Sequence, residues 1–176
     1  LGFATDEVAG MLGTSRTAVK GALQRARAAL GRARAGRAPR PASATEHQLA
    51  RRFADAYVAA DLPRLVALLT DDAWLSMPPA PHQYHGVDAI AAFWRASFVF
   101  RGDRLVRLLP THANTQPALG GYLIDPAGRV ATPSGLFVLT MAGDRIQAVT
   151  RFHLDALYPR FGLPASLPEP VGPLTG

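Results

Sequence analysis

The sequence predicts an α+β protein in which a helical hairpin precedes a larger domain, and three observations support this fold class. Apolar residues recur at helical spacing in the first 30 residues and again over residues 46–98. From Arg104 onward the pattern changes to strand-like runs separated by turn sequences. Residues 31–44, between the helical regions, are small, basic and proline-containing, with no apolar stripe. We therefore expect a hairpin over residues 1–35, a linker over 36–44, a domain over 45–164 and a Pro/Gly-rich tail over 165–176.

The hairpin has the pattern of two helices that meet at a tight turn. Thr5 or Asp6 is expected to cap the first helix and Ser15 the second, while Gly13 provides the backbone freedom that the corner requires. One helical period continues across the turn through the apolar residues Val8, Ala9, Met11, Leu12, Val19, Ala22, Leu23, Ala26 and Leu30. This spacing is typical of a helix-turn-helix, whose second helix enters the major groove of DNA.

The second helix of the hairpin carries polar and basic side chains that could reach base edges and phosphates. The predicted DNA-binding residues are Ser15, Arg16, Thr17, Lys20, Gln24, Arg25 and Arg27. The alternative is an ordinary amphipathic hairpin whose basic face is only solvated.

The charge distribution favours the DNA-binding interpretation. Residues 1–40 carry eight basic and two acidic side chains, whereas the remaining residues carry eleven of each, so the whole formal charge of +6 lies on the hairpin and linker. Cysteine is absent, which excludes disulfides and thiolate chemistry. No apolar run is long enough to span a bilayer and no secretory signal is recognisable, so we expect a cytoplasmic protein without a membrane partner.

In the larger domain we expect a helix over residues 46–60, opened by a capping box from Ser43 to Glu46 or from Thr45 to Gln48. A second helix should begin after Asp61, followed by a strand over 73–77, a proline-rich loop over 78–86 and a third helix over 87–98. Strands are expected at about 104–115, 116–124, 130–141 and 145–154, and a short helix at 155–161. Helices followed by a strand meander predict helices on one face of a curved antiparallel sheet.

Two resemblances to known families follow from these segments. The N-terminal segment LGFATDEVAGMLGTSRTAVKGALQRARAAL resembles the end of region four of an extracytoplasmic-function (ECF) sigma factor. This resemblance implies transcription initiation, with the second helix reading the minus-35 promoter element and with promoter DNA and RNA polymerase core as partners. Since the chain begins with Leu1 and nothing upstream covers Val8, Met11 and Leu12, we expect a fragment of a longer protein.

The larger domain contains the segments YVAADLPRLVALLTDDAWLSMPP, YHGVDAIAAFW and GLFVLTMAGDRIQAVTRF. With these segments it resembles the SnoaL-like domains of the nuclear-transport-factor-like cone fold. A subset of ECF sigma factors carries such a domain directly after region four, so both resemblances imply the same composite family.

A catalytic role would require a carboxylate or a histidine in an apolar cavity, where burial shifts its pKa toward the working pH. The carboxylates of the strand region, Asp125 and Asp144, fall in predicted turns. His153 and Asp155 could form a dyad, but a hydrogen-bonded histidine near a strand end is the simpler interpretation. We therefore predict no catalytic residue, no metal site and no cofactor.

Aromatic and amide side chains of the larger domain should surround the interior of the cone. The predicted pocket residues are Trp74, Met77, Tyr84, Phe93, Trp94, Asn114, Gln116, Tyr122, Phe137 and His153, and the alternative is that most of them are core. Such a pocket would take a small apolar ligand.

The sequence thus favours a sigma factor whose SnoaL-like domain regulates it intramolecularly. Two other hypotheses remain open: a SnoaL-like isomerase, cyclase or hydrolase acting on a small apolar substrate, and a module that serves only dimerisation.

Overall fold

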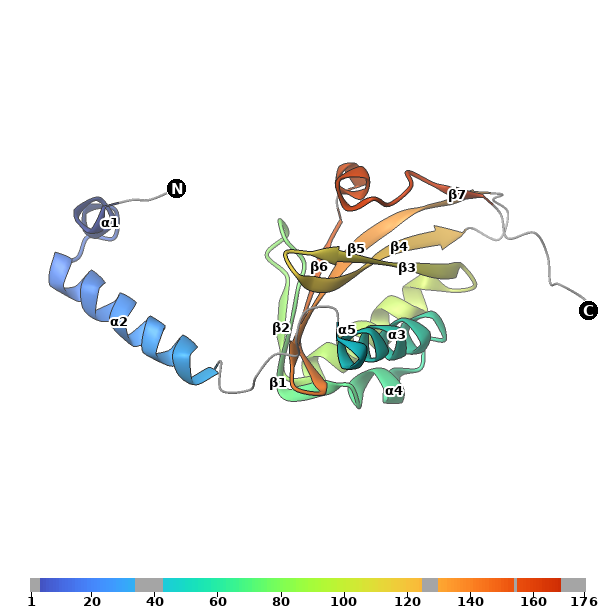
Figure 1. Ribbon diagram of the computed structural model, residues 1–176, viewed down its shortest axis with the longest axis horizontal. Coiled ribbons are helices and arrows are strands. Elements are labelled where there is room, and N and C mark those ends of the chain that lie inside the picture. Colours follow the sequence, from blue (N-terminus) through green and yellow to red (C-terminus); the bar gives the residue numbers. More distant parts are fainter. Residues whose placement is uncertain (1–3, 34–42, 125–129, 154, 169–176) are drawn as a thin grey trace, which may run out of the picture. The chain divides into compact units, whose positions relative to one another are not determined.

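The computed structural model describes residues 4–33, 43–124, 130–153 and 155–168. The chain divides into two compact units, Leu1–Ala38 and Pro39–Gly176 (Figure 1). Most of the predicted linker and of the C-terminal tail lies outside the described residues. The two units are described separately.

The first unit is a pair of helices, α1 (Thr5–Met11) and α2 (Arg16–Ala33). Ala4, rather than Thr5 or Asp6, precedes α1 as its N-cap, and its N–H donates to the Glu7 carboxylate at 2.7 Å. The expected cap of α2 is present, since Ser15 Oγ accepts the N–H of Ala18 at 3.2 Å. Gly13 adopts φ +59° at the corner. Glycine adopts this left-handed conformation at little cost because it has no Cβ.

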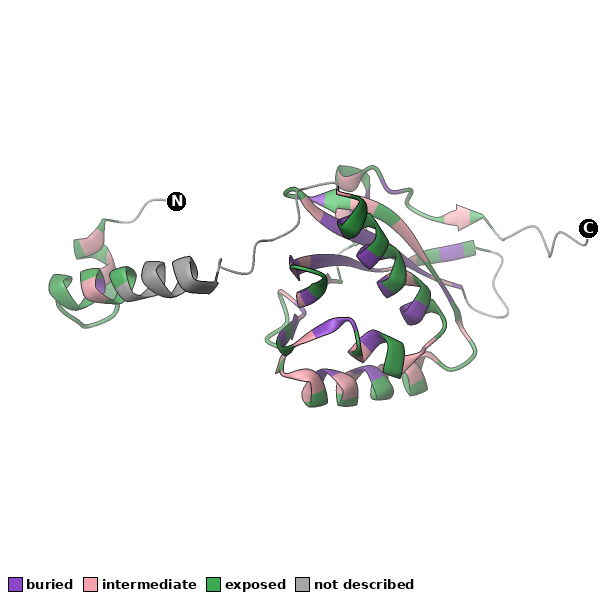
Figure 2. Ribbon diagram, turned by 60° about the horizontal axis from the view of Figure 1, so that its bottom comes forward, coloured by how far each residue is buried: buried purple, intermediate pink, exposed green. Residues whose placement is uncertain are grey.

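The hairpin buries little apolar surface of its own. Most of its described length is exposed (Figure 2). Only Ala9 and Val19 are buried among its described side chains, whereas Met11 and Leu12 are each 68% exposed. An ion pair between Arg16 Nε and Asp6 Oδ1, 3.2 Å apart, joins the two helices, but both groups are well exposed and the pair contributes little stability. The hairpin therefore presents an uncovered apolar face.

The described residues of the second unit form three α-helices, α3 (Ala44–Val58), α4 (Leu62–Val66) and α5 (Val87–Arg101). Ser43 caps α3 by accepting the Glu46 N–H at 3.2 Å, which is one half of the first capping box considered. Asp61 caps α4 by accepting the Arg64 N–H at 3.0 Å, as expected. The helices lie on the same side of the sheet (Figure 1).

The sheet has the strand order β2-β1-β6-β5-β4-β3, and the short strand β7 pairs with β5. The strands are β1 (Leu69–Ser76), β2 (Gln83–His85), β3 (Leu105–Ala113), β4 (Gln116–Ile124), β5 (Val130–Ala142), β6 (Arg145–Phe152) and β7 (Leu167–Pro168).

Two expectations about the sheet are wrong. Residues 83–85, predicted as loop, form β2, which pairs antiparallel with β1. The sheet is also mixed rather than antiparallel, because β6 pairs with β1 in parallel. The connection explains this: α5 carries the chain across to β3, and the meander from β3 returns β6 to the side of β1 in the same direction.

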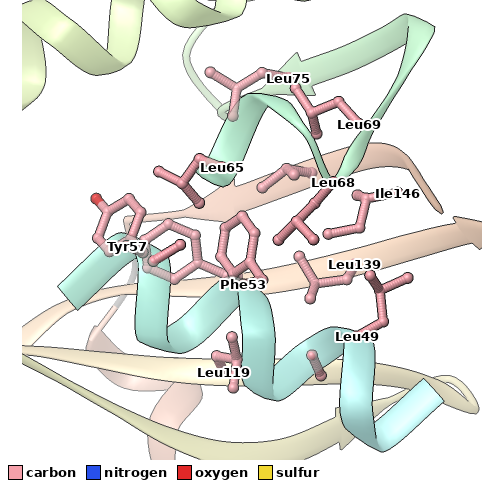
Figure 3. Close-up of a cluster of buried hydrophobic side chains, with 14 of the residues drawn as sticks. Leu49, Phe53, Tyr57, Leu65, Leu68, Leu69, Leu75, Leu119, Leu139 and Ile146 are labelled. Atoms are coloured by element: carbon pink, nitrogen blue, oxygen red, sulfur yellow. The ribbon is translucent and has the colours of Figure 1, made fainter. Parts of the chain in front are cut away.

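The main core lies between the helices and the sheet. Phe53 and Leu49 of α3 and Leu65 of α4 meet the sheet residues Leu139 and Ile146 in one cluster (Figure 3). Phe53 and Leu65 are completely buried. The α3 face with helical spacing thus packs on the sheet as the sequence indicated.

The opposite face of the sheet also carries a packed cluster, whereas the order of elements predicted helices on one face. A 3₁₀ helix, η1 (Asp155–Phe161), packs there through Tyr158, which is fully buried beside Tyr122. Strand β4 is consequently buried along nearly its whole length on both faces.

Tyr158 holds a β-bulge between β4 and β5. The pairing shifts between Gly121 opposite Gly135 and Tyr122 opposite Pro133, so Ser134 has no partner residue. The Tyr158 hydroxyl accepts the Gly135 N–H at 3.1 Å and donates to the carbonyl of Gly121. Burial raises the pKa of Tyr158, so the hydroxyl keeps its proton and remains a donor.

We expect Tyr158→Phe to lower the free energy of unfolding by about 1–3 kcal/mol, because it leaves the buried Gly135 N–H and Gly121 carbonyl without this partner. Urea unfolding followed by tryptophan fluorescence measures this in the second unit alone, since both tryptophans lie there.

Tyr84→Phe is the matched control. Tyr84 stacks on Phe93, and its hydroxyl has no hydrogen bond within the described residues, so its loss should cost less than about 0.5 kcal/mol. Equal effects of the two substitutions would contradict the role assigned to the Tyr158 hydroxyl.

Candidate functional site

The predicted DNA-binding residues of the hairpin lie on one exposed helix. Ser15 is the N-cap of α2, and Arg16, Thr17, Lys20 and Gln24 follow it with exposed side chains. Arg25 and Arg27 fall within α2, but their side chains lie outside the described residues.

The start of α2 is electrostatically suited to an anion. Its first turn contains no acidic residue, and the unpaired amides and helix dipole of an N-terminus favour negative charge. Lys20 adds a cation one turn further along the helix. Arg16 is engaged with Asp6, so a part of its charge is already compensated inside the hairpin.

The second unit contains a cavity of about 440 Å³ between α5, the C-terminal end of α3 and the strands of the sheet. Of the predicted pocket residues, Met77, Phe93 and His153 line it. The other lining residues are Tyr57, Ala96, Ser97, Phe98, Phe100, Arg101, Arg104, Val106, Leu123, Ser134 and Arg151.

The remaining predicted pocket residues lie elsewhere. Trp94 is buried against Phe53, and Phe137 packs in the same core. Tyr122 belongs to the cluster on the opposite face of the sheet. The structure therefore does not assemble these aromatic residues into one cavity.

The other four also lie apart from it. Trp74 is 45% exposed and packs against His85. Tyr84 does not line the cavity but stacks on Phe93, which does. Asn114 and Gln116 border a second cavity, of about 330 Å³, near η1. For the residues on strands, parity explains the division, because neighbouring residues of a strand face opposite sides of the sheet and both sides carry packed clusters.

Sequence reasoning missed the arginines of the cavity, Arg101, Arg104 and Arg151. A signal for one of them was present: Arg151 and His153 are two residues apart, a spacing that places both on the same side of β6 and its continuation. Arg101 is the last residue of α5 and Arg104 follows three residues later, and no periodic pattern distinguishes them from solvated charges.

His153 carries the titratable group of interest in this cavity. Partial burial and the neighbouring Arg151 lower the pKa of His153 below its ordinary value of 6.5, and the opposing effect of Asp155 is smaller. The imidazole is thus held neutral at neutral pH. No carboxylate lines the cavity within the described residues.

Neither a metal centre nor a membrane-crossing helix emerges from the part of the chain that the structure describes. There, no group of three or more His, Cys, Asp or Glu side chains is arranged to hold a metal ion. None of the described helices is both long enough and apolar enough to cross a bilayer.

Comparison with solved structures identifies the fold of the second unit. A proposed ketosteroid isomerase from Kribbella flavida superimposes with a TM-score of 0.51 at 19% identity, covering 61% of this chain and 76% of that one. A protein of unknown function with a cystatin-like fold from Methylobium petroleophilum gives a TM-score of 0.52 at 16% identity, covering 65% and 79%. At these identities the likeness concerns the fold alone, which is the expected cone fold.

Comparison of sequences covers both units. Residues 50–149 match the SnoaL-like domain family. The chain is also 40% identical over 164 residues to the ECF RNA polymerase sigma factor SigG of two strains of Mycobacterium tuberculosis. This alignment includes 92% of the chain but only 44% of the mycobacterial protein. The chain therefore belongs to the SnoaL-like domain family, here joined to a helical hairpin within a sequence related to ECF RNA polymerase sigma factors.

Proposed function

We propose that this chain serves transcription initiation as part of an ECF sigma factor, with its hairpin reading the minus-35 promoter element. The similarity to SigG over 92% of the chain carries this proposal. Promoter DNA and RNA polymerase core are then its partners, and the cytoplasm its location. Because the chain spans 44% of the length of those relatives, these roles concern the whole sigma factor.

In this proposal α2 is the recognition helix. Thr17, Lys20 and Gln24 have exposed side chains that can contact base edges or phosphates, and Arg25 and Arg27 add the sequence-predicted basic contacts. Ser15 contributes by capping α2 through the Ala18 N–H, and the other amides of the first turn are left for a phosphate.

The second unit is proposed to regulate the hairpin or the rest of the sigma factor from within the same chain. Residues 41–176 carry as many basic as acidic side chains, so this unit does not add to the electrostatic attraction for DNA. A tethered domain has a high effective concentration, and weak docking then suffices to change promoter or polymerase engagement. A small apolar ligand in the 440 Å³ cavity would supply a signal for that change.

An isomerase, cyclase or hydrolase activity receives less support from the cavity. Proton abstraction in an apolar site requires a base, and no carboxylate lines the cavity within the described residues. His153 is the candidate base of the cavity; Asp155 favours its protonation, but burial and Arg151 have the larger, opposite effect and lower its pKa. The cavity is better suited to binding than to turnover.

Replacing the exposed Lys20 by Gln tests the DNA-binding role. We expect weaker binding to any duplex, and a decrease of about 1 in the slope of the logarithm of affinity against the logarithm of salt concentration, because one phosphate contact is lost. Fluorescence anisotropy over a salt series measures both. Arg107→Gln, an equal change of charge at an exposed position of β3, is the control and should leave the slope unchanged. If Lys20→Gln left it unchanged too, Lys20 would not contact phosphate.

A further inference from the structure

We propose that the 440 Å³ cavity binds an apolar molecule that ends in a carboxylate, and that Arg151 is the residue that recognises this anionic end. The inference deepens the ligand-binding role proposed above and rests on it for the existence of a ligand. A ligand with a carboxylate, unlike a neutral apolar ligand, can pair with the arginines of the cavity.

The charge of the cavity favours an anion. Its described lining residues include three arginines, Arg101, Arg104 and Arg151, and no carboxylate. The ion pairs of the described chain involve other arginines, namely Arg16, Arg51, Arg64 and Arg145. The cavity therefore carries uncompensated positive charge next to an apolar wall, where charge interactions are stronger than in water.

Two of the three arginines already have structural partners. Arg101 donates to the carbonyls of Tyr57 and Val58 at the end of α3, at 3.1 and 3.3 Å. Arg104 donates to the carbonyls of Phe100 and Arg101 at the end of α5. Both guanidinium groups therefore donate to backbone carbonyls at helix C-termini, where carbonyls without a partner in the helix attract cations.

Arg151 is the least engaged of the three, since the described residues accept one hydrogen bond from it and two from each of the others. Its Nη2 donates to the Ser134 carbonyl at 2.8 Å, and its Cζ lies 4.9 Å from the ring centroid of Phe137, which holds the guanidinium plane. Its Nε, like that of Arg101, is buried and has no hydrogen bond within the described residues; its Nη1 has none there either and is not among the buried unpaired atoms. A carboxylate is the acceptor that a guanidinium fork binds best, and Nη1 leaves one arm of this fork to a ligand.

The backbone beside Arg151 is shaped to admit its side chain. Gly135 has φ +141°, and a Cβ at this position would stand 2.8 Å from Arg151 Nε. Glycine at the bulge thus leaves room for the guanidinium at the cavity wall.

The rest of the cavity accounts for the apolar part of the ligand. Met77, Phe93, Phe98, Val106 and Leu123 contribute apolar wall. His153, held neutral by burial and by Arg151, can add a hydrogen bond near the anionic end without needing a proton from solution. An amphipathic carboxylic acid satisfies both parts of the site.

Calorimetric titration of the full chain with octanoate and with octan-1-ol tests the inference, since the two probes share an apolar chain and differ in the end group. We expect octanoate to bind at least about tenfold more tightly than octanol. Arg151→Gln should weaken octanoate binding by about tenfold or more and leave octanol binding unchanged, which shows that the cavity is intact. Arg95→Gln, at an exposed position of α5, is the control and should change neither.

Equal affinities for the two probes, or octanoate binding that survives Arg151→Gln, would overturn the anionic specificity while leaving a ligand-binding cavity. Binding of neither probe would overturn both the inference and the ligand role proposed above. Either result leaves the DNA-binding role untouched, because the salt series with Lys20→Gln tests it separately.

The imidazole of His153 provides a second readout in an NMR titration. The charged groups around it are Arg151, Asp155 and, across the cavity, Arg101 and Arg104. Arg151→Gln should raise the pKa of His153 toward 6.5 by removing the neighbouring cation, without restoring it fully because burial remains. Saturating octanoate should raise this pKa in the unsubstituted chain. An unchanged pKa in both experiments would mean that neither Arg151 nor the probe lies beside His153.

Discussion

The hydroxyl of Tyr158 is the contact on which the geometry of the second unit depends. It bonds to Gly121 and Gly135 where the pairing of β4 and β5 shifts, and so fixes the bulge at Ser134. The Ser134 carbonyl in turn accepts Arg151, and Ser134 itself reaches the cavity wall. A short helix on one face of the sheet thereby determines where a guanidinium stands on the other face.

Much of this fold follows from local sequence signals. Ser15, Ser43 and Asp61 cap helices as side chains of their type do, and the strands from β3 to β6 begin and end within two residues of their predicted limits. The parallel pairing of β1 with β6 could not be predicted from the sequence of either strand. It depends on the path of the meander from β3 to β5, which sets the position and direction of β6. The two-sided burial of β4 required knowing that η1 folds back over the sheet.

The candidate sites show the same division. Exposed polar residues on α2 could be recognised from helical spacing, because a hairpin of this kind has few ways to pack. The cavity required the register of four strands and the direction of α5, so aromatic residues such as Trp94 and Tyr122 were assigned to it although they serve the cores. Arg151 was overlooked because a strand arginine usually faces water, whereas here the Gly135 bulge admits it to the wall. The proposed function accordingly rests on one local motif and one assembled cavity.

We infer that the second unit changes transcription initiation by the sigma segment to which it is joined. Run-off transcription by RNA polymerase core, with the full-length sigma factor compared with the same protein ending before Thr45, tests this most directly. We expect both forms to initiate and their output to differ, because removal of the tethered unit removes its effect on promoter or polymerase engagement. Equal output from both forms would contradict the regulatory role, and initiation by neither at promoters of its own genome would contradict the sigma assignment itself.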